Sequence, residues 1–397
     1  MFWRWLVGAG FSAPSWPRQW CGFLGDNIFL YGTLRHLDLL AVVAGTRDLA
    51  LADATLPGYA VARAPGGAYP LIAPQPGTQA QGLLLMDIPS QARARLDYYE
   101  LAFGYRLAEV SVRTAQGAQS ALAYFPPDSA QNGVAPWDLA AWVAQEGALS
   151  VQAAREVMAR MHTTPIADLP DLFPAIRARA WAKLCAAQQP TPATVRRQGA
   201  SDVEMQLLGG GYDGFFRLQR FRLRHHRYDG SQTPWFARET FEAFDAALVL
   251  PYDPATDEVL LIEQLRFGPL LRGDASPFVL EPVAGMVDTG ESPADCARRE
   301  ALEEAGLVLD ALHAMPAIYP SPGYSTEFFH CFLALCDLRA PRRATTGAAG
   351  EHEDIRAHVV AFDQVVQLVD SGEINAGPLV MMVLWLVRHR AELRASA

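Results

Sequence analysis

The chain has 397 residues, of which 50% are hydrophobic and 19% are charged, and this composition excludes an intrinsically disordered protein. A chain of this length is expected to form about two or three domains. The formal net charge of −10 and the pI near 5.4 argue against nucleic acid as the main partner. No segment reaches the roughly 18 apolar residues that a membrane span requires, so no membrane partner is expected.

Cysteine usage points to a reducing compartment. The five cysteines are odd in number and scattered, and no CxxC motif occurs. Neither a disulfide framework nor a zinc site is therefore predicted, and a cytoplasmic location is expected.

The first part of the chain divides into an extension and a β-rich domain. Residues 1–26 contain a short apolar run that Arg4, two glycines and Ser12 interrupt. Because a signal peptide has a longer apolar region, we expect an N-terminal extension, or a start assigned too early. Residues 27–127 alternate strand-like runs with Gly/Pro turns, and these runs are NIFLYG, QGLLLMDI, AEVSVRT and SALAYF.

The second part predicts a helical connector and a mixed domain. Residues 128–205 carry Ala, Leu, Arg and Trp at helical spacing and end in the linker-like stretch QQPTPATVRRQGAS. In residues 206–397, AALVLPYDPATDEVLLIEQLR predicts a β-hairpin, FFHCFLALC and DIRAHVVAF predict strands, and two helices close the chain. We therefore predict a multi-domain α+β and α/β protein whose last domain has a mixed sheet between helices.

Residues 285–307, GMVDTGESPADCARREALEEAGL, hold the most informative pattern of the chain. Ser292 and Pro293 predict a helix start, and Gly306 predicts its end. Glu300 and Glu304 are four residues apart and share one face of that helix.

This helix carries three crowded carboxylates, those of Glu300, Glu303 and Glu304. Like charges at this spacing destabilise a helix by about a few tenths of a kcal/mol per pair. A hard divalent cation such as Mg²⁺ removes the conflict, because it prefers carboxylate, water and phosphate oxygens. Arg299 is expected to pair with Glu291 or Glu303 and to orient it. The alternative is an ordinary acidic, solvated helix surface, but the number of residues in register favours a metal site.

The segment fills every position of the pattern G-x5-E-x7-R-E-U-x-E-E-x-G-U and so resembles the box of the Nudix hydrolase family. The resemblance covers residues 206–397 and is strongest to the ADP-ribose pyrophosphatase branch, in which a proline follows the box at the spacing of Pro322. It implies an α/β/α sandwich and two or more Mg²⁺ ions, with Mn²⁺ as an alternative. The implied metal ligands are Glu300, Glu304, Glu353 and the backbone carbonyl of Ala284.

The same resemblance assigns roles to further residues. Glu351 falls where the family has its catalytic base, and Glu303, Glu304 and Arg299 complete the implied catalytic set. Substrate contacts are implied for Phe215, which would stack on adenine, and for Arg238, Arg266, Pro322 and Glu327. The residue types suit this chemistry, because arginine forks bind phosphate oxygens and aromatic rings stack on bases. Solvated loop residues, surface ion pairs and core packing remain the alternative interpretations.

The first domain carries a second resemblance. FLYGTLR, then Gly67, Tyr69, Pro70 and LDYYE ending at Glu100, resemble the γ-glutamylcyclotransferase-like family, which implies a β-barrel. In that family the turn matching Tyr31, Gly32, Thr33 and Leu34 holds the substrate carboxylate, and Glu100 would be the general acid/base. The chain departs from the family where Leu101–Phe103 precede Gly104, so a non-catalytic scaffold is the alternative.

The resemblance of the last domain implies a Mg²⁺-dependent hydrolase that cleaves ADP-ribose to AMP and ribose 5-phosphate, while the first domain would be a cyclotransferase or a scaffold. The alternatives are another nucleotide sugar, such as a GDP-sugar or another ADP-sugar, and a nucleotide-sensing module. A homodimer through the last domain is expected, with the PWFARE region near Arg238 at the contact. The tandem arrangement resembles fusion proteins associated with tellurite resistance.

Overall fold

The computed structural model describes residues 27–127, 133, 135–188, 192–196, 198–339, 345–346 and 354–396. The expected N-terminal extension, residues 1–26, lies outside the described residues. The chain forms two compact units, Met1–Ala180 and Trp181–Ala397. Among the described residues, no helix has the length and apolar character needed to cross a lipid bilayer.

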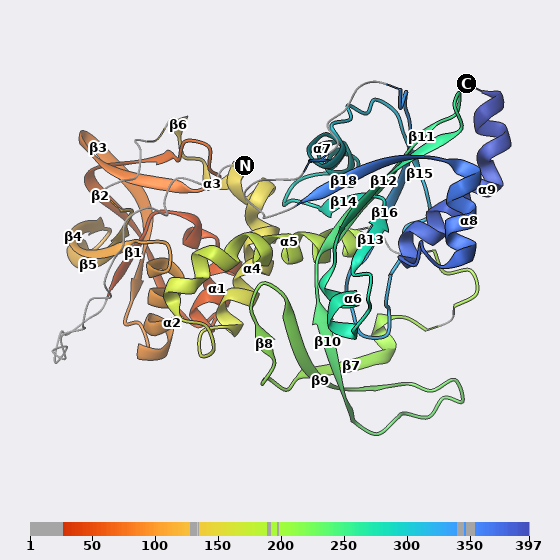
Figure 1. Ribbon diagram of the computed structural model, residues 1–397. Coiled ribbons are helices and arrows are strands. Elements are labelled where there is room, and N and C mark those ends of the chain that lie inside the picture. Colours follow the sequence, from red (N-terminus) through yellow and green to blue (C-terminus); the bar gives the residue numbers. More distant parts are fainter. Residues whose placement is uncertain are drawn as a thin grey trace. The chain divides into compact units, whose positions relative to one another are not determined.

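The first unit is built on a closed β-sheet (Figure 1). The strand order is β3-β1-β5-β4-β2-β6, and β3 also pairs with β2, so five strands close into a barrel that confirms the predicted fold. The strands are β1 (Ile28–Leu30), β2 (Ala50–Arg63), β3 (Pro70–Met86), β4 (Arg106–Thr114), β5 (Gly117–Phe125) and β6 (Ala135–Pro136). The barrel interior includes Phe29, Leu84, Val112 and Ala123, each at most 1% exposed.

Strand β2 was not among the runs identified in the sequence, because Pro57 and Gly58 interrupt it. The structure keeps both residues in the strand: the register with β3 shifts between Pro57 and Tyr59. Gly58 has φ +77°, a left-handed conformation that glycine adopts without strain. A β-bulge therefore replaces the turn that a Pro-Gly pair usually signals.

Helices cover one side of the barrel. They are α1 (Leu37–Ala44), α2 (Ser90–Leu101), α3 (Leu139–Trp142), α4 (Ala148–Ala159) and α5 (Leu169–Gln188), with a π-turn at Val143–Gly147. Helices α1, α2 and α4 pack against one another. The predicted connector, residues 128–205, contains α3, α4 and α5. Helix α4 belongs to the first unit and the end of α5 to the second.

The second unit contains a mixed sheet in the order β15-β16-β11-β12-β18-β17, with β13 on β12 and β14 on β11. Its strands are β11 (Asp245–Asp253), β12 (Glu258–Leu265), β13 (Phe278–Glu281), β14 (Val283–Met286), β15 (Leu312–Ala314), β16 (Phe328–Leu335), β17 (Thr345–Thr346) and β18 (Ile355–Ala361). The predicted hairpin is confirmed as β11–β12, and both predicted later strands are confirmed as β16 and β18.

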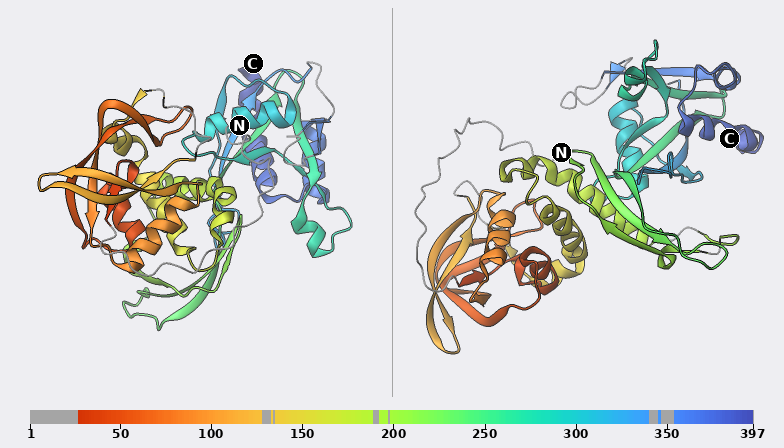
Figure 2. Two further views of the ribbon diagram at one scale, coloured as in Figure 1. Left: turned by 90° about the vertical axis from the view of Figure 1, so that its left-hand side faces the viewer. Right: turned by 90° about the horizontal axis from the view of Figure 1, so that it is seen from below.

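Helices lie on both faces of this sheet, as Figure 2 shows. The helices are α6 (Phe267–Arg272), α7 (Pro293–Ala305), α8 (Phe362–Ser371) and α9 (Gly377–Ala395). Leu260 and Ile262 of β12 join the core cluster under α7, whereas the alternate residues Val259 and Leu261 join the cluster under α8 and α9. This alternation confirms the predicted helix–sheet–helix sandwich.

A second, smaller sheet precedes the sandwich and was not predicted. It has the order β10-β9-β7, with β8 pairing to β9. The strands are β7 (Val203–Leu207), β8 (Tyr212–Asp213), β9 (Arg217–His225) and β10 (Phe236–Glu242). Several of its apolar side chains are exposed, including Met205 at 62% and Leu207 at 52%.

Candidate active site

Helix α7 presents the glutamates of the box, and its ends are those predicted. The Ser292 hydroxyl caps the N-terminus by accepting the N–H of Asp295 at 3.1 Å, and Pro293 follows in the first turn. Gly306 ends the helix with φ +63°. The alanine stripe Ala297, Ala301 and Ala305 is fully buried against the sheet, which turns the acidic residues toward β14.

Arg299 is the centre of an ion-pair network on this helix. Its Nε and Nη2 donate to the two carboxylate oxygens of Glu291, both at 3.0 Å. Its Nη1 lies 2.5 Å from Glu300 Oε1 and 3.4 Å from Glu303 Oε2. Burial disfavours the charged guanidinium, but these bonds and carboxylates outweigh burial and raise the pKa of Arg299. Arg299 therefore stays charged and holds Glu291 and Glu300 in place.

The carboxylates of Glu300 and Glu304 lie against the backbone of β14. Glu304 is only 3% exposed, and its Oε2 accepts the N–H of Ala284 at 3.0 Å. A Cβ added to Gly285 would lie 1.9 Å from Glu300 Oε1, so only glycine leaves room for that carboxylate. The structure thus places two of the predicted metal ligands, Glu300 and Glu304, beside the backbone of Ala284 and Gly285. The contact with Ala284 is made by its N–H, whereas the predicted ligand is its carbonyl.

The two carboxylates suit a hard divalent cation, which prefers carboxylate and other oxygen ligands, and the Ala284 carbonyl stays a predicted ligand. Among the described residues no three His, Cys, Asp or Glu side chains form a metal cluster by themselves. Glu353, the remaining predicted ligand, and Glu351, the predicted catalytic base, lie outside the described residues. Their roles stay predictions.

Two of the predicted substrate residues lie near each other at the end of β12. Arg266 donates through Nε to Glu281 Oε2 at 2.6 Å. Burial raises the pKa of Glu327, and the positive charge of Arg266 partly opposes this effect. Glu281 was not identified from the sequence, because its place beside Arg266 depends on the pairing of β13 with β12, where Glu281 lies opposite Ile262.

The other predicted substrate residues lie on the small sheet and its surroundings. Phe215 is 49% exposed and contacts the rings of Phe216 and Phe244, with centroids 4.8 and 5.6 Å away. Arg238 on β10 lies over the ring of Phe236 at 4.7 Å and donates to the carbonyl of Ala237. These two contacts of Arg238 are both within β10 and do not involve the box.

Pro322 lies in an exposed turn that is attached to β10. The carbonyl of Tyr324 in this turn accepts the N–H of Phe241 at 2.7 Å. The carbonyl of Phe241 in turn accepts the N–H of Thr326 at 3.0 Å. The segment around Pro322 and Glu327 is therefore connected to the strand that carries Arg238.

In the first unit, Glu100 lies near the end of α2 among tyrosines. Burial raises its pKa to about 7. The charge of Glu100 contributes to raising the pKa of the Tyr31 and Tyr105 phenols, after the larger effect of burial. Tyr31 donates its hydroxyl to the carbonyl of Tyr124 at 2.7 Å. Glu100 is therefore a carboxyl that can exchange a proton near neutral pH.

The predicted turn, Tyr31 to Leu34, follows β1 directly and enters a short 3₁₀ helix at Thr33–Arg35. A Cβ at Gly32 would lie 2.8 Å from Pro70 Cγ, which explains the glycine at this position. Asp97 was not identified from the sequence: it accepts the Tyr124 hydroxyl at 2.7 Å and pairs with Arg93.

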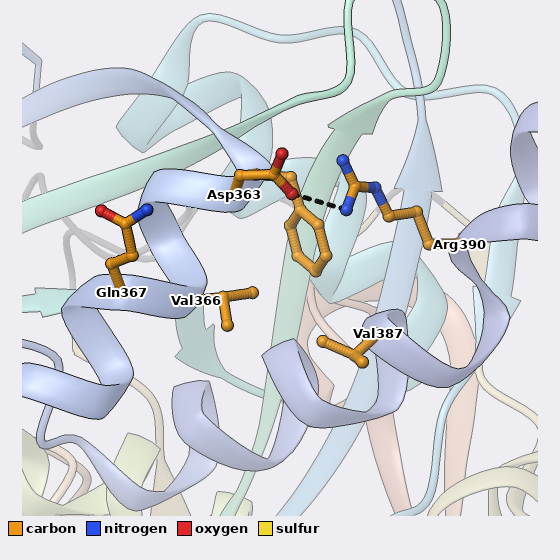
Figure 3. Close-up of a pocket in the computed structure, with 6 residues that line it drawn as sticks. Asp363, Val366, Gln367, Val387 and Arg390 are labelled. Atoms are coloured by element: carbon orange, nitrogen blue, oxygen red, sulfur yellow. Dashed lines mark hydrogen bonds and ion pairs between the residues drawn. The ribbon is translucent and has the colours of Figure 1, made fainter.

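A surface hollow of ≈ 440 Å³ lies between α8 and α9, on the face of the sheet opposite α7. Figure 3 shows Asp363 of α8 paired with Arg390 of α9 across it. The Arg390 guanidinium is also held by Asp257 through Nε at 2.9 Å. Because its charged lining is already paired and the box is on the other face, this hollow is not the candidate active site.

Comparison with known proteins agrees with this division. A gamma-glutamyl cyclotransferase, AIG2-like family model matches residues 28–144, and a NUDIX domain model matches residues 243–381. The ADP-ribose pyrophosphatase of Escherichia coli K12 is 40% identical over 196 residues, which is 49% of this chain and 93% of that protein. The ADP-ribose pyrophosphatase of Haemophilus influenzae is 37% identical over 203 residues, 50% of this chain and 93% of that protein.

A GDP-mannose pyrophosphatase of Escherichia coli O1:K1 is 32% identical over 174 residues, covering 44% of this chain and 89% of that protein. These relatives align with about half of the chain, and the first unit is matched by the gamma-glutamyl cyclotransferase, AIG2-like family model. The chain therefore belongs to the Nudix hydrolases, in a group related to ADP-ribose pyrophosphatase, and carries a gamma-glutamyl cyclotransferase, AIG2-like domain ahead of its NUDIX domain.

Proposed function

We propose that the second unit hydrolyses the diphosphate of ADP-ribose to AMP and ribose 5-phosphate. One observation carries the proposal: Glu300 and Glu304 lie against Ala284 and Gly285 while Arg299 holds Glu300 from the other side. Such an arrangement of oxygens fits a cation-assisted attack on a diphosphate. The choice of ADP-ribose rests on the 40% identity to a protein of that named activity.

The chain's residues divide the chemistry between them. Glu300, Glu304, Glu353 and the carbonyl of Ala284 would hold Mg²⁺, or Mn²⁺ in its place. When bound, the cation neutralises the diphosphate charge and lowers the pKa of a coordinated water. Glu351 would accept the proton of the attacking water, which adds to one phosphorus as the bridging P–O bond breaks. Arg299 keeps Glu291 and Glu300 oriented throughout.

Substrate binding is assigned to the residues around the end of β12 and the small sheet. Arg266 and Glu327 would meet the diphosphate and ribose, and Arg238 and Phe215 would bind the adenylate end, with Pro322 shaping the turn beside them. A homodimer through the second unit would supply Arg238 and Phe215 to a neighbouring site. The exposed apolar residues Met205 and Leu207 beside them support such a contact. Sedimentation of the full chain, compared with M205E, tests the dimer.

A GDP-sugar is the alternative substrate, because the GDP-mannose pyrophosphatase match is 32% identical. A nucleotide-sensing role without turnover is the alternative of another class. The test is a panel containing ADP-ribose, other ADP-sugars and GDP-mannose, incubated with Mg²⁺ and analysed for nucleoside monophosphate. We expect AMP release from ADP-ribose to be the fastest reaction and to be lost in E304Q. Binding without AMP release would refute hydrolysis, and faster GMP release from GDP-mannose would change the substrate.

A second candidate function belongs to the first unit. Glu100, whose pKa is raised to about 7 by burial, is suited to take and return a proton at neutral pH. We assign it the acid/base role in cyclising a γ-glutamyl group, with the Tyr31–Leu34 turn holding the substrate carboxylate. Release of 5-oxoproline from γ-glutamyl substrates, absent in E100Q, tests this activity. No release by the wild type would leave the unit a scaffold.

A further inference from the structure

The C-terminal end of α5, from Trp181 to Gln188, lies outside both family matches, which cover residues 28–144 and 243–381. It nevertheless belongs to the second unit. We infer that Trp181 is a positioning residue for the Nudix box, which holds the Glu291 loop so that Arg299 and Glu300 keep their orientation. This inference rests on the proposed hydrolase function.

The contacts of Trp181 lead directly to the box. Its ring packs against the core cluster that α7 forms with the sheet. Its indole Nε1 donates to the backbone carbonyl of Glu291 at 3.4 Å. The carboxylate of that same Glu291 accepts both the Nε and the Nη2 of Arg299. Only Glu291 and Arg299 separate the indole from Glu300, which Arg299 reaches at 2.5 Å.

The loop that Trp181 contacts has its own internal bonds. The N–H of Asp288 donates to Glu291 Oε2 at 3.1 Å, and the N–H of Glu291 donates to the carbonyl of Asp288 at 3.0 Å. The Glu291 carboxylate therefore serves the loop and Arg299 together. A displaced Glu291 would loosen both, and the effect would pass to Glu300 through Arg299.

A second contact keeps the end of α5 in place. Lys183 Nζ lies 3.5 Å from Glu242 Oε1, and Glu242 Oε2 accepts Arg217 Nη1 at 2.8 Å. Glu242 is 8% exposed and Arg217 6%, so this pair is buried beside β11. Two independent contacts thus fix the segment that carries Trp181. Tryptophan suits the position because it has a large apolar ring with a single polar donor.

The test compares W181F, which keeps an aromatic ring but loses the donor, with W181A, which loses both. W385F is the matched control, because Trp385 packs in the cluster under α8 and α9 on the opposite face of the sheet. Two readouts are measured on the full chain: ADP-ribose turnover against Mg²⁺ concentration, and hydrogen exchange of residues 286–292 without metal. Since residues that orient ligands typically affect activity by about 10- to 100-fold, we expect about a 10-fold loss of kcat in W181A and a smaller loss in W181F.

Both Trp181 variants are expected to exchange the Asp288 and Glu291 amides faster than the wild type, while W385F does not. If W181A does not fold, W181F carries the test. Wild-type exchange in both variants, or a lowered Tm with unchanged exchange and kcat, would overturn the inference. If the wild type does not cleave ADP-ribose, the proposed function fails, and hydrogen exchange alone decides whether Trp181 positions the loop.

Discussion

Replacing Gly285 with alanine tests whether the Glu300 carboxylate lies against the backbone of Gly285. Gly285 is not among the residues with positive φ, so alanine is compatible with the backbone there. The added methyl carbon would lie 1.9 Å from Glu300 Oε1 and 2.0 Å from its Cδ. The substitution therefore acts through contact with Glu300 and not through backbone strain.

The size of the effect follows from these distances. Ordinary contact begins at 3.4 Å, so the Glu300 carboxylate must retreat by about 1.5 Å, and a misplacement of about 1 Å can lower a rate about 100-fold. The carboxylate cannot move freely, because its side chain is 13% exposed and Arg299 holds it. We expect G285A to lose at least about 100-fold in kcat and to lose about 1–3 kcal/mol of stability from overpacking.

The assay is AMP release from ADP-ribose over a range of Mg²⁺ concentrations, with the free energy of unfolding measured alongside. E300A and the double variant G285A/E300A are the controls. Because the clash needs Glu300, the double variant should regain the stability lost in G285A while its turnover remains that of E300A. Wild-type turnover in G285A would refute the placement of Glu300 against β14, and so would equal destabilisation by G285A with and without Glu300.

Three further substitutions test stability in other parts of the chain. Glu156 pairs with the buried Arg160 and Arg179 at 2.8 and 2.7 Å, so E156Q should cost about 3–5 kcal/mol in chemical unfolding, because two buried cations lose the negative charge beside them. Burial raises the pKa of Glu100 to about 7 in the folded protein. The contribution of Glu100 to folding stability is therefore fully present below the pKa of the carboxyl in the unfolded chain, and it is lost as pH rises through about 7. E100Q should therefore be more stable than the wild type at pH 8, by up to about 3 kcal/mol, and this gain should disappear at pH 4. Asp257 accepts hydrogen bonds from the Tyr252 hydroxyl and from two arginines of α9. Its φ is +63°, which asparagine also tolerates, so D257N removes the charge without straining the backbone. D257N should therefore lose about 2–3 kcal/mol of unfolding free energy at pH 7, measured as a lower Tm. Burial acts to raise the pKa of Asp257, but its hydrogen bonds lower the pKa overall. The stability difference between D257N and the wild type should therefore shrink only as pH falls below the usual aspartate range.

The local parts of the site could be predicted from the sequence. The ends of α7 depend on Ser292, Pro293 and Gly306, which act within a few residues of themselves. The pairing of Arg299 with Glu291 spans eight residues and depends on the same helix start. Short-range spacing therefore determines how the glutamates are presented.

The features that could not be predicted from the sequence depend on contacts between residues that are distant in the sequence. Strand β2 was missed because Pro57 and Gly58 resemble a turn until β3 is present to pair on both sides of the bulge. The small sheet β7–β10 was missed because β7, in which Val203, Met205 and Leu207 alternate with polar residues, spans the predicted boundary between residues 205 and 206. Its pairing with β9 becomes evident only in the tertiary structure. Glu281 joins the site through its contact with Arg266, and Trp181 through its contact with Glu291. No local sequence pattern indicates either contact.

The distribution of these residues bears on substrate choice. The box holds Glu300 and Glu304 against β14. Under the proposed function it would therefore determine the reaction and not the base. The residues that could tell one nucleotide from another lie elsewhere, with Phe215 and Arg238 on or beside the small sheet. That sheet is joined to the sandwich through the hydrogen bonds of Phe241 with the turn that precedes Glu327. A change of substrate would therefore come from replacing side chains on the small sheet and this turn, while α7 and β14 stay unaltered.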